Sequence, residues 1–379
     1  MNGFKILKKN IIFIFFDGAR LEQIKNSEFF SSFAKESVFF NQMITSAPYT
    51  TAALHAMFSG CYGNKTETNS YWKSLNFKKE KFKSLISYLN ENNYHTCGDV
   101  HSKLILAKHD FNEFHIHDEL NVNLIEHHCN LIKNMKNYNK NGKNFFLFLD
   151  YSKIHTGIMQ EVLKKYDNFS DEYFKNKDKN ESRYNALFDG AEQYFKEIIK
   201  FLKDENLLDN SLLILTSDHG ISIGEKFGER AYGAFCYDYT VKLFAYFHSN
   251  NLPTKEISSQ VRHIDLMPTI LDYLGIDFDT SYEKIDGHSL LPIISGDTLK
   301  EEIAYIETAN PLNEKGPPKE PNTKAVRTSK WKLILNEYNN SVELYDLEND
   351  PDENNNLANQ NLDVETELLK KLQEFNHPS

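Results

Sequence analysis

The sequence predicts an α/β fold with a mostly parallel central sheet. Three apolar runs of strand length each stop at an aspartate: residues 11–16 before Asp17, 145–149 before Asp150, and 213–217 before Asp218. Short, nearly continuous apolar runs are typical of strands buried on both faces of a parallel sheet. Because the carboxyl ends of parallel strands meet at one edge, we expect these aspartates to form a shared acidic rim where ligands bind.

The other elements follow from hydrophobic periodicity. Helical spacing predicts helices at residues 27–36, 81–92, 185–203 and 265–275, the last ended by glycine. Further strands are predicted at residues 95–100 and 240–247. The helix that precedes the Asp218 strand implies a right-handed crossover between parallel strands.

The chain divides into a larger domain, residues 1–300, and a small C-terminal α+β subdomain, residues 301–379. In the subdomain, strand-like pieces and a closing helix fall at residues 303–308, 325–327, 331–336, 342–345 and 364–375. Two polar stretches, residues 164–183 and 310–323, predict loops near the rim.

Composition restricts the partners. Over 379 residues, 43 Lys and Arg face 54 Asp and Glu, and the net charge of −11 argues against a nucleic-acid partner. No segment reaches transmembrane length, and the first apolar run stops at Asp17 without a signal-peptide cleavage site. The four cysteines lack CxxC spacing, which favours reduced thiols and a cytoplasmic location.

The most informative segment is the strand that ends in Asp218, His219 and Gly220. Packing alone gives no reason to end a buried strand with a carboxylate and an imidazole. Both groups are ligands for divalent cations. Together with Asp17, they predict a cation site at the rim.

Thr50 opens a helix-forming run that ends at Gly60. Taken alone, this position predicts a helix N-cap. A hydroxyl beside the free N–H groups of a helix N-terminus also suits anion binding, and a nearby cation would turn it into a nucleophile. The rim residues Asp17 and Asp218 favour the second interpretation.

These motifs resemble the sulfatase-like branch of the alkaline phosphatase superfamily over nearly the whole chain. The similarity rests on residues 15–20, 47–60, 150–156, 216–225, 265–269, 286–292 and 331–351. The resemblance implies an alkaline-phosphatase-like, three-layer α/β/α domain, with residues 1–300 as the catalytic part.

One departure bears on the reaction. Sulfatases carry Cys or Ser in a Cys/Ser-x-Pro-x-Arg frame for conversion to formylglycine, whereas residues 50–54 read Thr-Thr-Ala-Ala-Leu. Threonine is typical of relatives that handle phosphate esters, including phosphoethanolamine and glycerophosphate transferases. The resemblance therefore implies a metal-dependent phosphoryl hydrolase or transferase acting on a small-molecule or glycan phosphate ester. The alternatives are a sulfuric ester hydrolase without formylglycine and a non-catalytic binding protein that keeps the fold.

The resemblance also implies the ligands. One divalent cation (Mn²⁺, Zn²⁺, Mg²⁺ or Ca²⁺) would be held by Asp17, Thr50, Asp218 and His219. Gly18 stands where many sulfatases carry a second aspartate, so one expected ligand is missing. A second cation would need Asp150 and His155, or another histidine.

The remaining site residues have proposed roles and structural alternatives. His155, or else His55, would bind the phosphoryl oxygens or protonate the leaving group; His55 is equally a candidate core histidine. Asp150 would orient His155 or bind substrate. Arg20, Lys226 and Arg230 would complete an anion pocket or be solvated or structural charges. The other histidines of note, which lack convincing metal spacing and are predicted at the surface, are His115, His117, His127 and His128.

Overall fold

The computed structural model describes residues 9–70, 73–106, 110–308 and 320–376. A nine-stranded sheet forms the centre of the larger part, in the order β4-β3-β5-β1-β6-β7-β2-β8, with β9 beside β2. Every neighbouring pair is parallel except the two that include β7. The strands are β1 (Asn10–Phe16), β2 (Val38–Ile44), β3 (His95–Val100), β4 (Glu113–Ile116), β5 (Phe145–Tyr151), β6 (Ser211–Ser217), β7 (Lys242–His248), β8 (Lys255–Ile257) and β9 (Val261–Arg262). The predicted α/β class is confirmed.

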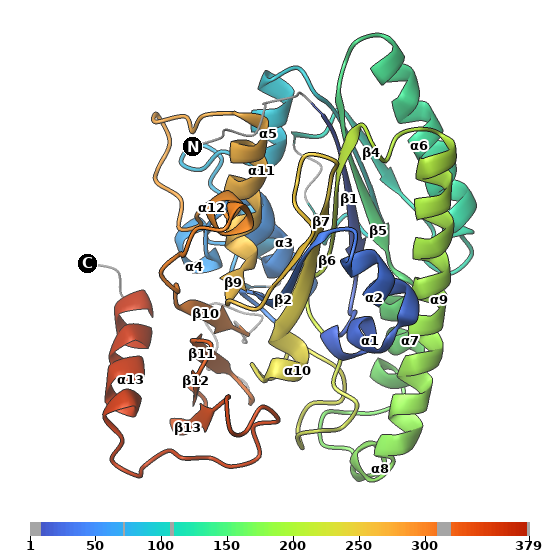
Figure 1. The fold of residues 1–379 in the computed structure, drawn as a ribbon. Coiled ribbons are helices and arrows are strands. Elements are labelled where there is room, and N and C mark those ends of the chain that lie inside the picture. Colours follow the sequence, from blue (N-terminus) through green and yellow to red (C-terminus); the bar gives the residue numbers. More distant parts are fainter. Residues whose placement is uncertain (1–8, 71–72, 107–109, 309–319, 377–379) are drawn as a thin grey trace.

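Helices cover both faces of this sheet and give three layers (Figure 1). One face packs against α1 (Leu21–Asn26), α2 (Glu28–Ala34), α6 (Leu124–Lys140), α7 (Lys153–Ile158), α8 (Asp171–Lys175) and α9 (Lys177–Asp204). The other face packs against α3 (Thr50–Ser59), α5 (Leu85–Glu91), α11 (Leu266–Leu274) and α12 (Leu291–Ser295). Shorter helical pieces are α4 (Gly63–Thr66), η1 (Lys73–Asn76), η3 (Met159–Leu163), α10 (Asp238–Val241) and η4 (His263–Asp265).

The central strand β1 shows why the apolar runs fold as they do. Its side chains alternate between the two cores, Ile12 and Ile14 in one and Ile11 and Phe13 in the other, and all are buried. Burying each such side chain contributes about 1.5–3 kcal/mol. Hydrophobic burial on both faces therefore fixes β1 in the middle of the sheet, and its carboxyl end points to the rim.

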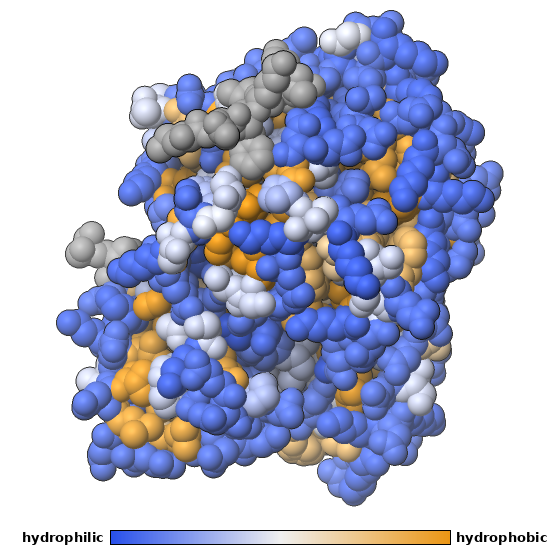
Figure 2. Space-filling model, in the orientation of Figure 1, coloured by the Kyte–Doolittle hydropathy of each residue, from blue (hydrophilic) through white to orange (hydrophobic). Residues whose placement is uncertain are grey.

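The C-terminal part is an antiparallel sheet in the order β10-β11-β12-β13 with one covering helix, as predicted. Its elements are β10 (Ala304–Glu307), β11 (Thr323–Arg327), β12 (Trp331–Asn336), β13 (Ser341–Asp346) and α13 (Asp363–Asn376). Leu368 and Leu372 of α13 pack on one face of this sheet, and Val241 and Cys236 of the larger part lie against the other. The face seen in Figure 2 is mostly hydrophilic, and hydrophobic residues show over the C-terminal part at lower left and also over the middle of the larger part.

The structure corrects two predicted elements. The polar stretch 164–183 is not a loop throughout, because it holds α8 and the first turns of α9. The strand predicted from residue 240 starts at Lys242, after the short helix α10. The predicted loop 310–323 lies mostly outside the described residues. Within the described ranges no helix is long and apolar enough to span a membrane, and the four cysteines are unpaired.

Candidate active site and cation centre

Four adjacent strands end in an aspartate, one more than the three predicted. In order across the sheet they are Asp99 of β3, Asp150 of β5, Asp17 after β1 and Asp218 after β6. The register aligns these ends, since Phe15 lies opposite both Asp150 and Thr216. All four aspartates are fully buried. The acidic rim is therefore a row of buried carboxylates along the carboxyl edge of the sheet.

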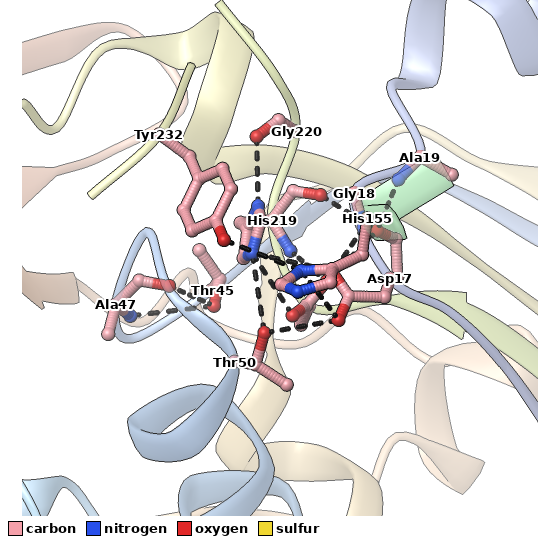
Figure 3. Close-up of polar contacts among 12 residues, drawn as sticks. Asp17, Gly18, Ala19, Thr45, Ala47, Thr50, His155, His219, Gly220 and Tyr232 are labelled. Atoms are coloured by element: carbon pink, nitrogen blue, oxygen red, sulfur yellow. Dashed lines mark hydrogen bonds and ion pairs between the residues drawn. The ribbon is translucent and has the colours of Figure 1, made fainter. Parts of the chain in front are cut away.

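Thr50 faces the middle of this row from the first turn of α3 (Figure 3). Its Oγ1 lies 3.4 Å from Oδ2 of Asp17 and 3.5 Å from Nε2 of His219. The helix N-cap is Tyr49, in an extended conformation, so the prediction that Thr50 caps the helix is wrong. The Thr50 hydroxyl is directed to the rim instead of to its own backbone.

Asp17, Asp218 and His219 form a set that fits a divalent cation. Oδ1 of Asp17 and Oδ2 of Asp218 are buried, and neither has a hydrogen-bond partner among the described residues. Nε2 of His219 lies 3.7 Å and 3.2 Å from these two oxygens. The other ring nitrogen of His219 is 2.9 Å from the Gly220 carbonyl, to which Nδ1–H donates, so the Nε2 lone pair faces the site.

The electrostatics of these three residues also fit the binding of a divalent cation. Burial acts to raise the pKa of Asp17, but His155, His219 and His101 outweigh it and hold that pKa well below its usual range. Burial raises the pKa of Asp218 to about 6, and the charge of Asp17 adds to the effect. Two carboxylates packed this closely repel each other, and a cation between them would remove that repulsion.

His155 and Tyr232 cover the Thr50 hydroxyl (Figure 3). Nδ1 of His155 lies 3.5 Å from Oδ2 of Asp17 and 3.4 Å from the Tyr232 hydroxyl. The Tyr232 ring stacks on His219 with centroids 4.2 Å apart. His155 thus stands on the solvent side of the threonine, where a group bound to Thr50 would meet it.

Asp150 does not contact His155 directly, contrary to the expectation that it orients this histidine. It binds His101, whose Nδ1 lies 2.6 Å from Oδ2 of Asp150 and whose ring lies against His155 with centroids 4.7 Å apart. Burial disfavours the charged imidazole, but Asp150 outweighs it and raises the pKa of His101 to about 9. The residues whose ligand atoms converge for a second cation are Asp17, His101 and His155, in place of Asp150 and His155.

A pocket of about 510 Å³ opens above these residues. It is lined by Thr50, His101, His155 and Tyr232 together with Ser102, Ile105, residues 117–120 and Met159. The pocket joins the nucleophile candidate to solvent, and its volume fits a small-molecule ligand.

The three predicted anion-binding cations lie elsewhere. The Arg20 guanidinium is paired with Glu22 and Glu225. Lys226 binds the backbone carbonyl of Glu353 in the C-terminal part, and Arg230 donates to the carbonyl of Tyr166. Each of them has a structural partner, and none lines the pocket.

His55 also lies away from the rim. It is buried on the far side of α3, where its ring stacks on Phe77 with centroids 6.0 Å apart. This position agrees with the alternative of a core histidine.

Sequence reasoning missed three residues near the site: Asp99, His101 and Tyr232. The first two lie on or just after a predicted strand, so the same strand-end signal that identified Asp17 was available. The histidines predicted at the surface are also partly misplaced, because His117 and His128 are buried against Asp99. Tyr232 has no comparable local signal.

Solved structures share this fold. A protein solved with its substrate D-glucosamine-2-N,6-O-disulfate matches with a TM-score of 0.74 and 15% identity over 97% of both chains. The phosphonate monoester hydrolase SpPMH from Silicibacter pomeroyi matches with a TM-score of 0.73 and 13% identity over 97% of this chain and 94% of its own. The class is thus an α/β protein with the fold of these two structures and a candidate cation centre at the sheet edge.

The chain belongs to the sulfatase family. The family model described as Sulfatase matches residues 9–276, and the N-sulphoglucosamine sulphohydrolase C-terminal model matches residues 235–377. Arylsulfatase K of Xenopus laevis is 30% identical over 196 residues, which are 50% of this chain and 35% of the relative. Arylsulfatase K of Bos taurus is 31% identical over 211 residues, or 52% and 36%. The chain therefore spans about a third of the length of these curated relatives.

Gly220 offers a test of how tightly the cation set is held. Its amide donates to the Thr240 carbonyl at 2.8 Å, and a Cβ at Gly220 would stand 2.1 Å from the carbonyl oxygen of Tyr239. We expect Gly220→Ala to displace His219, to cost about 1–3 kcal/mol of unfolding free energy and to weaken cation binding measured by calorimetry. Gly142→Ala is the control for cation binding: its φ of +76° strains an alanine and lowers stability, but a Cβ there meets nothing within 4 Å, so the affinity should stay at the wild-type value. Unchanged cation affinity in Gly220→Ala would contradict the expectation.

Proposed function

We propose that this chain is a cation-dependent sulfuric ester hydrolase that uses the Thr50 hydroxyl as its nucleophile. The observation that carries the proposal is the position of Thr50 Oγ1, which lies between Asp17 and His219 at the base of an open pocket. Membership of the sulfatase family and the likeness to arylsulfatase K support a sulfate ester over the phosphate ester expected from threonine alone. The neighbour solved with a sulfated glucosamine supports a glycan or aryl substrate.

Asp17, Thr50, Asp218 and His219 would hold the cation. When bound, it would supply positive charge to offset the charge that develops on the transferred group, and would make the hydroxyl easier to deprotonate. The free N–H groups in the first turn of α3 also favour an anionic sulfo group beside Thr50.

The residues account for both halves of the reaction. Thr50 Oγ1 bonds to the ester sulfur while the bond from sulfur to the leaving oxygen breaks with its electron pair. The threonine proton passes to solvent, and the leaving oxygen takes a proton from His155. His155 then accepts a proton from water, the water oxygen bonds to sulfur, and sulfate leaves as the Thr50 oxygen regains its proton.

One observation favours a second candidate, hydrolysis of a phosphorus ester. Residues 50–54 lack the Cys/Ser-x-Pro-x-Arg frame, so Thr50 is a plain hydroxyl. A phosphonate monoester hydrolase is among the structures with this fold. The same pocket would accept a phosphoryl group with the same residues in the same roles.

A panel of 4-nitrophenyl esters decides between these candidates. The purified chain is treated with a chelator, reloaded with Ca²⁺, Mg²⁺, Mn²⁺ or Zn²⁺, and given the sulfate, phosphate, phosphate diester and phenylphosphonate. We expect turnover of the sulfate that disappears with chelator and returns with one of the cations. Faster turnover of a phosphorus ester would support the second candidate, and no turnover of any ester with any cation would support a binding protein.

The proposed role of His155 predicts a dependence on the leaving group. In His155→Gln we expect kcat/KM to fall about 100-fold for a sulfated sugar alcohol but less than about tenfold for 4-nitrophenyl sulfate. The reason is that an alkoxide needs a proton to leave, whereas nitrophenolate does not. His55→Gln, a histidine away from the pocket, is the matched control. An equal loss for both substrates would contradict the assignment of His155 as the acid.

A further inference from the structure

A second cluster of histidines surrounds Asp99, outside the site described above. Nδ1 of His117 and Nε2 of His128 lie 2.7 Å and 2.8 Å from Oδ2 of Asp99, and Nε2 of His127 lies 2.8 Å from Oδ1. These three imidazoles come from the segment after β4 and from the first turns of α6, which packs against β5 beside β3. All three imidazoles therefore contact the Asp99 carboxylate, and the ligand atoms of Asp99, His127 and His128 lie within 4.8 Å of one another.

The side chains of this cluster are almost entirely buried. Asp99 and the His128 side chain are fully buried, the His117 side chain is 1% exposed, and only His127, at 32%, reaches solvent. A buried carboxylate is costly unless a positive charge accompanies it. Hydrogen bonds from the three imidazoles stabilise the Asp99 carboxylate, and a bound cation would add a full compensating charge.

The outer hydrogen bonds of these rings match those of metal-binding histidines. The second nitrogen of His128 lies 2.6 Å from the Tyr194 hydroxyl, and that of His117 lies 2.9 Å from the Ser152 hydroxyl. Such partners fix the ring orientation and direct the opposite nitrogen inward. For His128, the tautomer that donates from the outer nitrogen to Tyr194 leaves a lone pair on the nitrogen that faces Asp99, which is the form that binds a cation.

We propose that Asp99, His127 and His128 bind a divalent transition-metal cation, with Zn²⁺ as the best fit. Two imidazole nitrogens and one carboxylate oxygen are donors that Zn²⁺ takes, and the fourth position of its tetrahedron would stay open. Ligands at about 2.0–2.1 Å in a tetrahedron stand about 3.3 Å apart, so loading would draw together these three donor atoms, which lie within 4.8 Å of one another. This inference is independent of the proposed catalytic function.

The bound cation has a structural consequence for the pocket. His117 lines the pocket wall, and its contact with Ser152 leads to the start of α7, which carries His155. The cation would join β3 to α6, and the hydrogen bond from His117 to Asp99 would connect it to this wall of the pocket.

The test measures cation content in variants of the whole chain. Metal is removed with a chelator, Zn²⁺ is restored, excess is dialysed away, and bound zinc per chain is measured by mass spectrometry. We expect His127→Ala and Asp99→Asn each to hold about one equivalent less than wild type, with at least tenfold weaker Zn²⁺ binding in calorimetry. His127 is the preferred position because its partial exposure lets the variant fold.

Two comparison variants distinguish zinc bound at Asp99 from a cation bound beside Thr50. The Asp218→Asn substitution weakens cation binding at the centre beside Thr50. In that variant, the equivalent of zinc that is lost in His127→Ala should still be bound. His248→Ala, at the opposite edge of the sheet, should bind as much zinc as wild type. Wild-type zinc content and affinity in both His127→Ala and Asp99→Asn would overturn the proposal and leave the cluster as a hydrogen-bond network.

Discussion

Thr50→Ala is expected to lower kcat/KM for the best ester substrate by at least about 10⁴-fold while the chain stays folded. Loss of a nucleophile leaves only the positioning and electrostatic contributions of the rest of the site, which explains the size of the effect. The substitution removes a hydroxyl and a methyl group at the pocket base, so the packing of α3 against the sheet hardly changes. The measurement is steady-state kinetics, with circular dichroism and thermal unfolding as checks on the fold.

Thr50→Ser is the matched control, because it keeps the hydroxyl and removes only the methyl group. We expect it to retain activity within about tenfold of wild type. Ser59→Ala changes a buried hydroxyl at the other end of α3, which contacts Cys61, and should also stay active. Substrate turnover by Thr50→Ala at the wild-type rate would exclude Thr50 as the nucleophile and favour direct attack by water.

Mass spectrometry of the peptide that contains Thr50 would identify the covalent intermediate. Rapid acid quenching during turnover should trap a mass increase of one sulfo group on the peptide that contains Thr50. For a phosphorus ester the same peptide should carry the corresponding phosphorus group. A peptide that never gains mass, under conditions where product forms, would contradict the covalent step.

The sequence predicted the main features of the site because they depend on strand ends. Asp17 and Asp218 follow strands that are recognisable from their apolar runs, and parallel strands bring such ends to one edge. Thr50 was placed beside them through the family motif, although its role as a cap was wrong. His155 likewise follows the strand that ends at Tyr151.

Other features depend on contacts between distant segments, which leave little trace in the local pattern. His127 and His128 look like polar residues of an amphipathic helix, and only the packing of α6 brings them to Asp99. Lys226 looks available for an anion, but its partner Glu353 is 127 positions away. Such long-range pairings decide whether a charged side chain is free for function.

Asp238→Asn is expected to lower the free energy of unfolding by about 3–5 kcal/mol, the cost of removing one partner from a buried charge network. Asp238 lies between the two parts of the molecule and binds Arg327 through both carboxylate oxygens, at 2.9 Å and 2.7 Å. Lys332 binds the same carboxylate at 2.8 Å and Glu353 at 2.8 Å. The Arg327 and Lys332 side chains are at most 1% exposed, so asparagine leaves their charges in a nonpolar environment with too little compensation.

The control is Asp171→Asn, whose partner Lys175 is 73% exposed and whose loss should leave unfolding unchanged. Equal denaturant midpoints for the Asp238 variant and wild type would contradict the expected result.

The network also predicts a pH dependence. Burial alone would raise the pKa of Asp238, but Arg327 and Lys332 outweigh it and hold the pKa far below its usual value. A carboxylate whose pKa is lower in the folded state stabilises the fold above its unfolded pKa of about 4 and loses that contribution as the pH falls further. Glu353 acts in the opposite sense, because burial raises its pKa to about 7. Wild type should therefore lose more stability than Asp238→Asn between about pH 5 and pH 3 in denaturant titrations. Parallel acid profiles for the two proteins would show that Asp238 is not the group whose ionisation joins the two sheets.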